Sequence, residues 1–168
     1  MSGNPESIGE LFEVAIALER AAETLYRELE KMFSHYPEVS LFWKSYAEEE
    51  DGHAAYLERT RGRMSSERLS GHADITILQK AQECLEKTSP VVLAGIQTLE
   101  DAYQLATELK NSEVNTIFEF MIENFSTDEW EQSQFLQAQL KSHVARLEND
   151  FPDSYKSKIA RQNIFVLA

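Results

Sequence analysis

The chain has 168 residues, of which 42% are apolar, and this suits one domain with a buried core. Its formal net charge is −13 and the sequence shows no basic face of the kind that nucleic-acid binding needs, while its single cysteine excludes a disulfide framework or a cysteine-rich metal site. No segment approaches the roughly 20 consecutive apolar residues that span a bilayer, and the start MSGNPESIGE has no signal-peptide core. We therefore expect a cytoplasmic protein that binds neither nucleic acid nor membrane.

The first part of the chain predicts a pair of helices. Ser7 can cap a helix that runs to about Ser34, with Glu10 completing a capping-box pattern. Pro37 marks the turn, because proline is tolerated only in the first turn of a helix, and the second helix ends near Gly62. Side chains spaced alternately by four and three residues indicate a bundle-facing stripe on each helix. The first stripe holds Leu11, Ala15, Leu18, Ala22, Leu25, Leu29 and Met32, and the second holds Val39, Trp43, Tyr46, Glu50, His53, Leu57, Thr60 and Met64.

A long connection follows, with a loop over residues 65–73 and a shorter helix over about 74–87. Ser89-Pro90 is typical of a helix start, so we expect a third helix from there to about residue 110. Asn111-Ser112 favours a short turn.

A fourth helix is expected from Glu113 to as far as Asn149, with a break near Ser126. The pattern predicts an all-α four-helix bundle, made of two antiparallel helical hairpins joined by a long crossover that contains a short helix. We expect one domain over residues 1–168, with the core bundle over about 7–150. The tail, 151–168, ends in the apolar segment NIFVLA, which we expect to pack on the bundle or on a partner.

Two charged slots interrupt the apolar stripe of the second helix, and they hold Glu50 and His53. Glu19 lies in the middle of a second stripe on the first helix. Counted from the turn near Tyr36, Glu19 lies about 17 residues before it and the other two about 14 and 17 after it, so all three reach nearly the same depth at about 1.5 Å per residue. Because a buried carboxylate is costly unless it is paired or metal-bound, the pattern indicates a site for iron or manganese.

Other interpretations of the same residues stay open at this point. Glu-x-x-His occurs by chance in charged helices, and an interior histidine is commonly a hydrogen-bonded core residue. The two glutamates could also face solvent on a partly exposed hairpin.

Glu19, Tyr26 seven positions later, and then Glu50-x-x-His53 after a short turn resemble the first half of the ferritin-like superfamily, and most of all its rubrerythrin-type domains. The resemblance covers roughly residues 7–150. It implies a ferritin-like bundle in which two such halves face each other and hold two iron ions that react with oxygen or peroxide. It also implies a homodimer, which the apolar tail favours.

The second half departs from that pattern. When Tyr103 is aligned with Tyr26, Ile96 takes the place of Glu19, while Ser126 and Glu129 take those of Glu50 and His53. Glu129 is the nearest substitute ligand, ahead of Glu100 and Glu123, whereas His143 falls far beyond the level of the site. The predicted metal ligands are therefore Glu19, Glu50, His53 and Glu129, holding one or two ions of iron, with manganese and zinc as alternatives.

Two functions follow from these residues. The first is a metal-binding ferritin-like protein that acts as a non-haem iron oxidoreductase on oxygen or peroxide, or handles iron. The alternative is a non-catalytic helical scaffold or dimeric interaction protein descended from a di-iron enzyme. A third reading, an acidic helical adaptor of unrelated ancestry, leaves the common depth of Glu19, Glu50 and His53 unexplained.

The remaining candidate residues are assigned structural roles. Cys84 is expected to pack in the crossover helix, and His35 and His72 to be exposed. Trp43 and Tyr46 are expected in the core or an interface. Tyr26 is expected in the core, where it could hydrogen-bond a ligand carboxylate.

Overall fold

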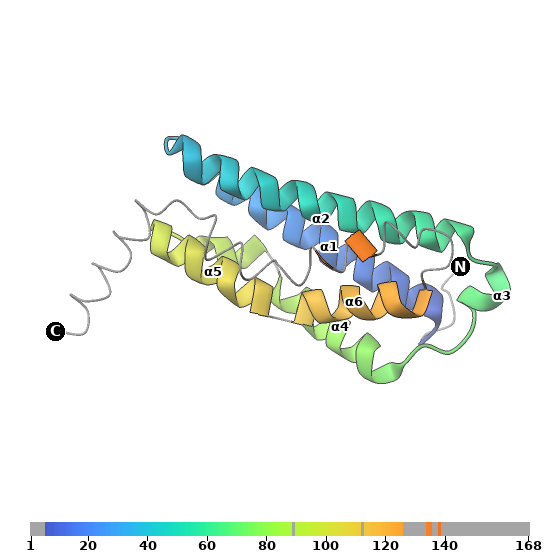
Figure 1. The fold of residues 1–168 in the computed structure, drawn as a ribbon. Helices are drawn as coiled ribbons and strands as arrows, with labels where there is room; N and C mark the ends of the chain where they lie inside the picture. The colour runs from blue at the N-terminus through green and yellow to red at the C-terminus, as the bar shows by residue number, and fades with distance from the viewer. Residues whose placement is uncertain (1–5, 89, 112, 126–133, 136–137, 139–168) are drawn as a thin grey trace.

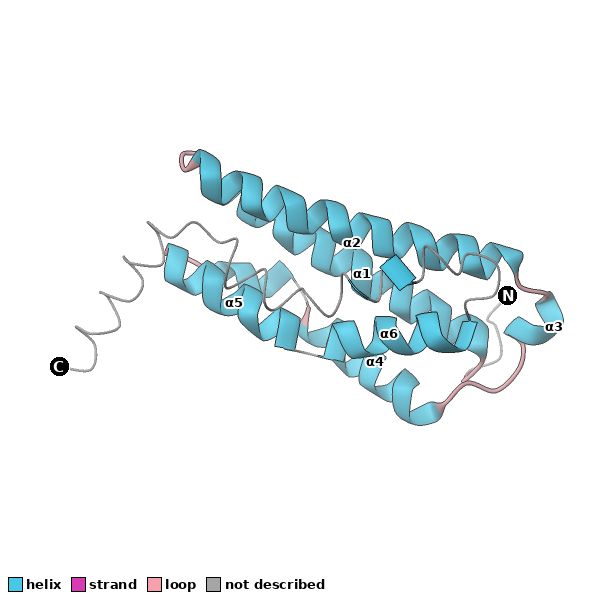
Figure 2. Ribbon diagram, in the orientation of Figure 1, coloured by secondary structure: helices cyan, strands magenta, loops and turns pink. Residues whose placement is uncertain are grey.

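The structure is a computed structural model that describes residues 6–88, 90–111, 113–125, 134–135 and 138 (Figure 1). Within these residues the secondary structure is helical and no strand is present, which confirms the predicted all-α class (Figure 2). No helix in this part of the chain has both the length and the apolar character that crossing a bilayer requires.

The first two helices form the predicted antiparallel pair. Helix α1, Ile8–Met32, begins where the Ser7 hydroxyl accepts a hydrogen bond from the Glu10 amide at 3.1 Å, so the predicted cap is confirmed. Helix α2, Pro37–Arg63, begins with the proline in its first turn. The two helices lie side by side along most of their length (Figure 1).

The connection contains two helical segments. Helix α3, Ser66–Leu69, is a single turn within the predicted loop. Helix α4, Ile75–Lys87, begins where the Asp74 carboxylate accepts hydrogen bonds from the amides of Thr76 and Ile77. It packs against α1, as expected for the short helix of a crossover.

The predicted third helix is interrupted. A 3-10 helix, η1, spans Pro90–Gly95, and helix α5 spans Leu99–Asn111. The Thr98 hydroxyl accepts a hydrogen bond from the Asp101 amide at 3.2 Å, and the Asp101 carboxylate accepts bonds from the amides of Gln97 and Thr98 at 3.0 and 3.1 Å. This reciprocal capping starts a new helix, so the prediction of a single helix from residue 90 was wrong.

The second predicted hairpin turn is also corrected. Helix α6, Glu113–Phe125, is separated from α5 by one residue, whereas two antiparallel helices need a loop of about two to five. Figure 1 shows α5 and α6 following one another along the bundle. Helices α5 and α6 therefore run in the same direction and do not form the predicted hairpin. The continuation toward Asn149, the break near Ser126 and the tail 151–168 lie outside the described residues.

The apolar core divides into two clusters. The turn-end cluster, near the α1–α2 turn, consists of Ala22, Leu25, Tyr26, Leu29, Phe33, Val39, Phe42, Trp43, Tyr46, Ala47 and Ala102. The far-end cluster consists of Leu11, Phe12, Ala15, Leu18, Tyr56, Leu57, Leu78, Ala81, Cys84, Ile117, Phe118, Met121, Ile122 and Phe125. Helix α5 thus contributes to the first cluster and α6 to the second. Between the clusters lies a layer of α1 and α2 that holds buried polar side chains.

Gly52 lies in the interior of α2, and a β-carbon added there meets no atom within 4 Å. We expect Gly52→Ala to raise the free energy of unfolding by about 1 kcal/mol, because glycine is the costlier residue in a helix interior. Urea unfolding of both proteins measures this. Gly62→Ala, at an equally open position in the last turn of α2, is the control and should give a smaller gain. A loss of stability in Gly52→Ala would contradict the expectation.

Candidate metal centre

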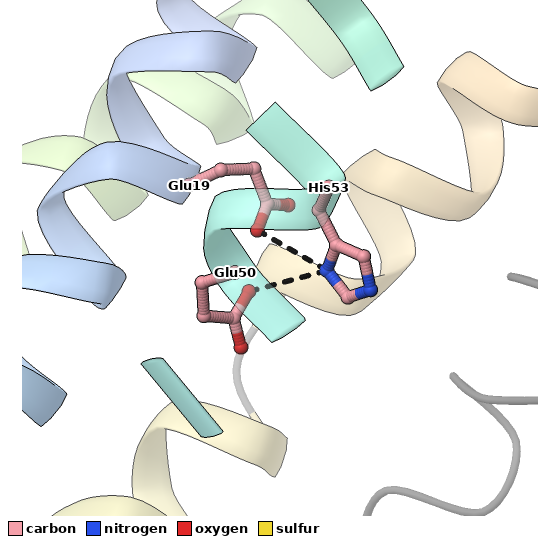
Figure 3. A group of neighbouring side chains, drawn as sticks. All are labelled: Glu19, Glu50 and His53. Atoms are coloured by element: carbon pink, nitrogen blue, oxygen red, sulfur yellow. Dashed lines mark hydrogen bonds and ion pairs between the residues drawn. The ribbon is translucent and has the colours of Figure 1, made fainter. Parts of the chain in front are cut away.

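Glu19 of α1 and Glu50 and His53 of α2 occupy the polar layer between the two clusters. Their exposed fractions are 2%, 1% and 1%, so all three side chains are buried. Figure 3 shows both carboxylates pointing toward one edge of the imidazole ring. The prediction that these residues face the core at one depth is confirmed.

One nitrogen of His53 faces both carboxylates. The His53 Nδ1 to Glu50 Oε2 distance is 3.2 Å, and the His53 Nδ1 to Glu19 Oε2 distance is 3.5 Å (Figure 3). The spacing of three residues places Glu50 and His53 on the same face of α2. One potential ligand atom from each residue lies within 4.8 Å of the other two, so the three side chains could hold one metal ion.

The electrostatics of the site follow from its burial. Burial and the negative charge of Glu50 raise the pKa of Glu19 to about 8. Burial alone would lower the pKa of His53, but hydrogen bonds to Glu19 and Glu50 outweigh it and raise that pKa to about 10. At neutral pH the metal-free site therefore holds protons that the same side chains release in the unfolded chain.

The donor set fits a divalent cation. Glu19 Oε2 is buried, and its contact with His53 Nδ1 is 3.5 Å, which is too long for a strong hydrogen bond and leaves this carboxylate oxygen weakly satisfied. A cation bound by this oxygen, a Glu50 oxygen and the His53 Nδ1 would satisfy it. Carboxylate and imidazole ligands suit iron, manganese and zinc.

Helix α6 places an aromatic ring on the site. Phe118 is 1% exposed and stacks on His53, with ring centroids 4.3 Å apart and an interplanar angle of 23°. This contact was not predicted from the sequence, because the chain reversal predicted at residues 111–112 places Phe118 at another level of the bundle than His53. The signal that could have identified Phe118 is the helical periodicity of residues 99–125, if it is followed from one helix into the next without a reversal.

The predicted counterparts from the second half do not reach the site within the described residues. Ile96 lies between η1 and α5 and packs against the turn-end cluster. Ser126, Glu129 and His143 lie outside the described residues, so the assignment of Glu129 as a ligand stays a prediction. Glu123 is exposed on α6.

Aromatic side chains line the turn-end side of the centre. Tyr26 is buried, and burial followed by the negative charge of Glu50 raises its pKa well above the usual value. Its ring stacks on Trp43 at 6.0 Å and contacts Tyr46 at 5.6 Å. The predicted core positions of these three residues are confirmed. A hydrogen bond from Tyr26 to a ligand carboxylate stays a prediction.

The other candidate residues have the expected surroundings. Cys84 is buried in the far-end cluster on α4. His35 and His72 are exposed, in the α1–α2 turn and in the connection respectively. These placements favour packing for the cysteine and leave both histidines away from the metal centre.

An ion-pair network that was not predicted from the sequence joins α1 to α2 on the outer side of the centre. The Arg20 guanidinium contacts Asp51, Glu23 at 3.0 Å and Glu58 at 3.3 Å. The hydrogen bond to Asp51 is the main reason that the pKa of Arg20 is raised. Since Arg20 follows Glu19 and Asp51 follows Glu50, the network links the helices at the level of the ligands.

We expect Arg20→Gln to lower the free energy of unfolding by about 1 kcal/mol or less, because Arg20 is part of an exposed network. Arg61→Gln is the matched control: among the described residues Arg61 pairs across the same helices with one carboxylate, that of Glu13 at 3.3 Å, and its loss should cost less. Urea unfolding at low and high salt measures both, and salt should reduce the difference. A larger cost for Arg61→Gln would contradict this account.

Buried carboxylates and a Glu-x-x-His pair within a helical bundle define a ferritin-like protein with a potential metal centre. The rubrerythrin family model matches residues 10–138. The chain therefore belongs to the rubrerythrin family, within the ferritin-like superfamily. The comparison with curated proteins and the comparison with solved structures each found no match.

Proposed function

We propose that this protein binds iron through Glu19, Glu50 and His53 and acts as a non-haem iron oxidoreductase on oxygen or peroxide, or in iron handling. The observation that carries the proposal is the convergence of three buried ligand groups, among them a Glu19 carboxylate oxygen that has only a long, 3.5 Å contact with His53 Nδ1. Membership of the rubrerythrin family supports iron as the metal. Glu129 is proposed as a fourth ligand.

Each residue has a defined task in this proposal. The Glu19 and Glu50 carboxylates neutralise the charge of a divalent ion, and His53 Nδ1 completes a three-sided donor set. Bound iron would supply the electrons for reduction of oxygen or peroxide. The surrounding apolar clusters keep bulk water from the ligands, which strengthens their interaction with a cation.

The test is anaerobic loading of the purified, untagged protein with Fe(II), followed by desalting, elemental analysis and exposure to oxygen or peroxide. We expect wild type to retain iron and to oxidise it faster than free Fe(II). Glu50→Ala/His53→Ala should retain background iron only. Glu48→Ala, which removes an exposed carboxylate from the same helix, should behave like wild type. Wild type that neither retains iron nor speeds its oxidation would refute the proposal.

The Phe118 ring favours a second candidate, the non-catalytic helical scaffold, because an apolar side chain faces the site from the second half of the chain. Under this alternative the protein would act through its surface, as a homodimer or with another partner. Wild type and Glu50→Ala/His53→Ala would then both contain only background metal, and the variant would be as stable as wild type or more stable. A metal-dependent loss of stability in the variant would exclude the scaffold.

A further inference from the structure

The side of the metal centre that faces α6 is apolar. Phe118 covers one face of the His53 imidazole, and its neighbours on α6 in the same cluster are Ile117, Met121 and Ile122. Each of these four side chains is 1% exposed. Within the described residues, α6 therefore adds no oxygen or nitrogen ligand to those of Glu19, Glu50 and His53.

A second divalent ion beside the first would need ligands of its own. Iron and similar ions bind carboxylate oxygens and imidazole nitrogens, and a phenyl ring offers neither.

The stacked ring also restricts how His53 can turn. Its plane lies within 23° of that of Phe118, and the Nδ1 edge faces both carboxylates (Figure 3). Tyr56 supports Phe118 from α2, with an edge-on contact at 6.3 Å. Phe118 is thus held in place against the imidazole, and it keeps the Nδ1 of His53 directed toward the two carboxylates.

We infer that the centre holds one divalent ion per chain, and that Phe118 is the residue that closes the position a second ion would take. This inference rests on the proposed function, since it specifies how many ions the same ligands bind. It makes Phe118 a determinant of metal number, although the ring itself binds no metal.

The experiment is anaerobic titration of the full chain with Fe(II), read as the metal-to-chain ratio by elemental analysis and by native mass spectrometry. We expect one ion per wild-type chain, and background in His53→Ala. About two ions per chain, or one ion shared by two chains, would overturn the inference while leaving iron binding intact. Background metal in wild type would instead refute the proposed function itself, so the two failures are distinguishable.

Two substitutions test the role of Phe118. Phe118→His keeps a flat ring of similar size but supplies ligand nitrogens, and we expect its ratio to rise above one. Phe118→Leu keeps the position apolar and should stay at one ion. A ratio of one in a folded Phe118→His, or above one in Phe118→Leu, would overturn the assigned role. If Phe118→His does not fold, the metal-to-chain ratio of Phe118→Leu still tests the role of Phe118, since a ratio above one in that variant would overturn it.

Discussion

Fe(II) should raise the midpoint of thermal unfolding of the wild-type protein by about 5–10 °C and leave that of Glu19→Gln/His53→Ala unchanged. A ligand that binds only the folded state at 100 times its Kd adds about 2.7 kcal/mol of stability. For a chain of this size, each kcal/mol corresponds to about 2–4 °C. Circular dichroism under anaerobic conditions measures the two midpoints with and without metal.

The control for this shift is again Glu48→Ala, whose exposed carboxylate lies on the same helix as Glu50. It should show the wild-type response, since only the buried residues act as ligands. Adding a chelator should reverse the shift in both proteins. An equal shift in Glu19→Gln/His53→Ala would mean that Fe(II) binds at the acidic surface instead.

The second prediction concerns the metal-free protein, whose free energy of unfolding should fall between pH 6 and pH 9. The pKa of His53 is raised from 6.5 to about 10, so the stability it contributes is complete below pH 6.5 and is lost as the pH rises through 10. The pKa of Glu19 is raised from 4.5 to about 8, so the stability that its neutral form contributes is complete below pH 4.5 and is lost as the pH rises through 8. Across this window the folded chain binds more protons than the unfolded chain, and stability therefore decreases as pH rises.

We expect a decrease on the order of a few kcal/mol, since one pKa unit corresponds to about 1.4 kcal/mol and the two groups interact. Urea unfolding with a chelator present, at pH 6 and pH 9, measures it. Glu19→Gln/His53→Gln removes both titrating groups and should show a smaller decrease over the same range. A wild-type stability that rises with pH in this window would contradict the assigned protonation of the site.

The first hairpin could be predicted almost completely because its signals are local and agree with one another. Ser7 and Pro37 fix the starts of α1 and α2, and the four-three stripe fixes the faces that pack. Once those are known, the rise per residue places Glu19, Glu50 and His53 at one level without any knowledge of the second half.

The second half was harder because its turn signals are ambiguous. Asn111-Ser112 has the composition of a turn, yet the helices on either side continue along the bundle. Conversely, Thr98 and Asp101 form a capping pair inside a stretch that looks uniformly helical. The alignment of Ser126 and Glu129 depended on the turn predicted at residues 111–112, and the same turn is why Phe118 was not expected beside His53. Propensity alone cannot decide between a kink and a reversal, since tertiary packing decides it.

The division of the core into two apolar clusters bears on how cooperatively the molecule behaves. Helices α1 and α2 run through both clusters, but the layer between them holds Glu19, Glu50 and His53 in place of apolar contacts. We expect the two ends to fluctuate as partly separate units of local unfolding that meet at this layer. A cation bound to ligands from both helices would couple those units. Metal loading would then determine whether the two ends of the bundle unfold together or separately.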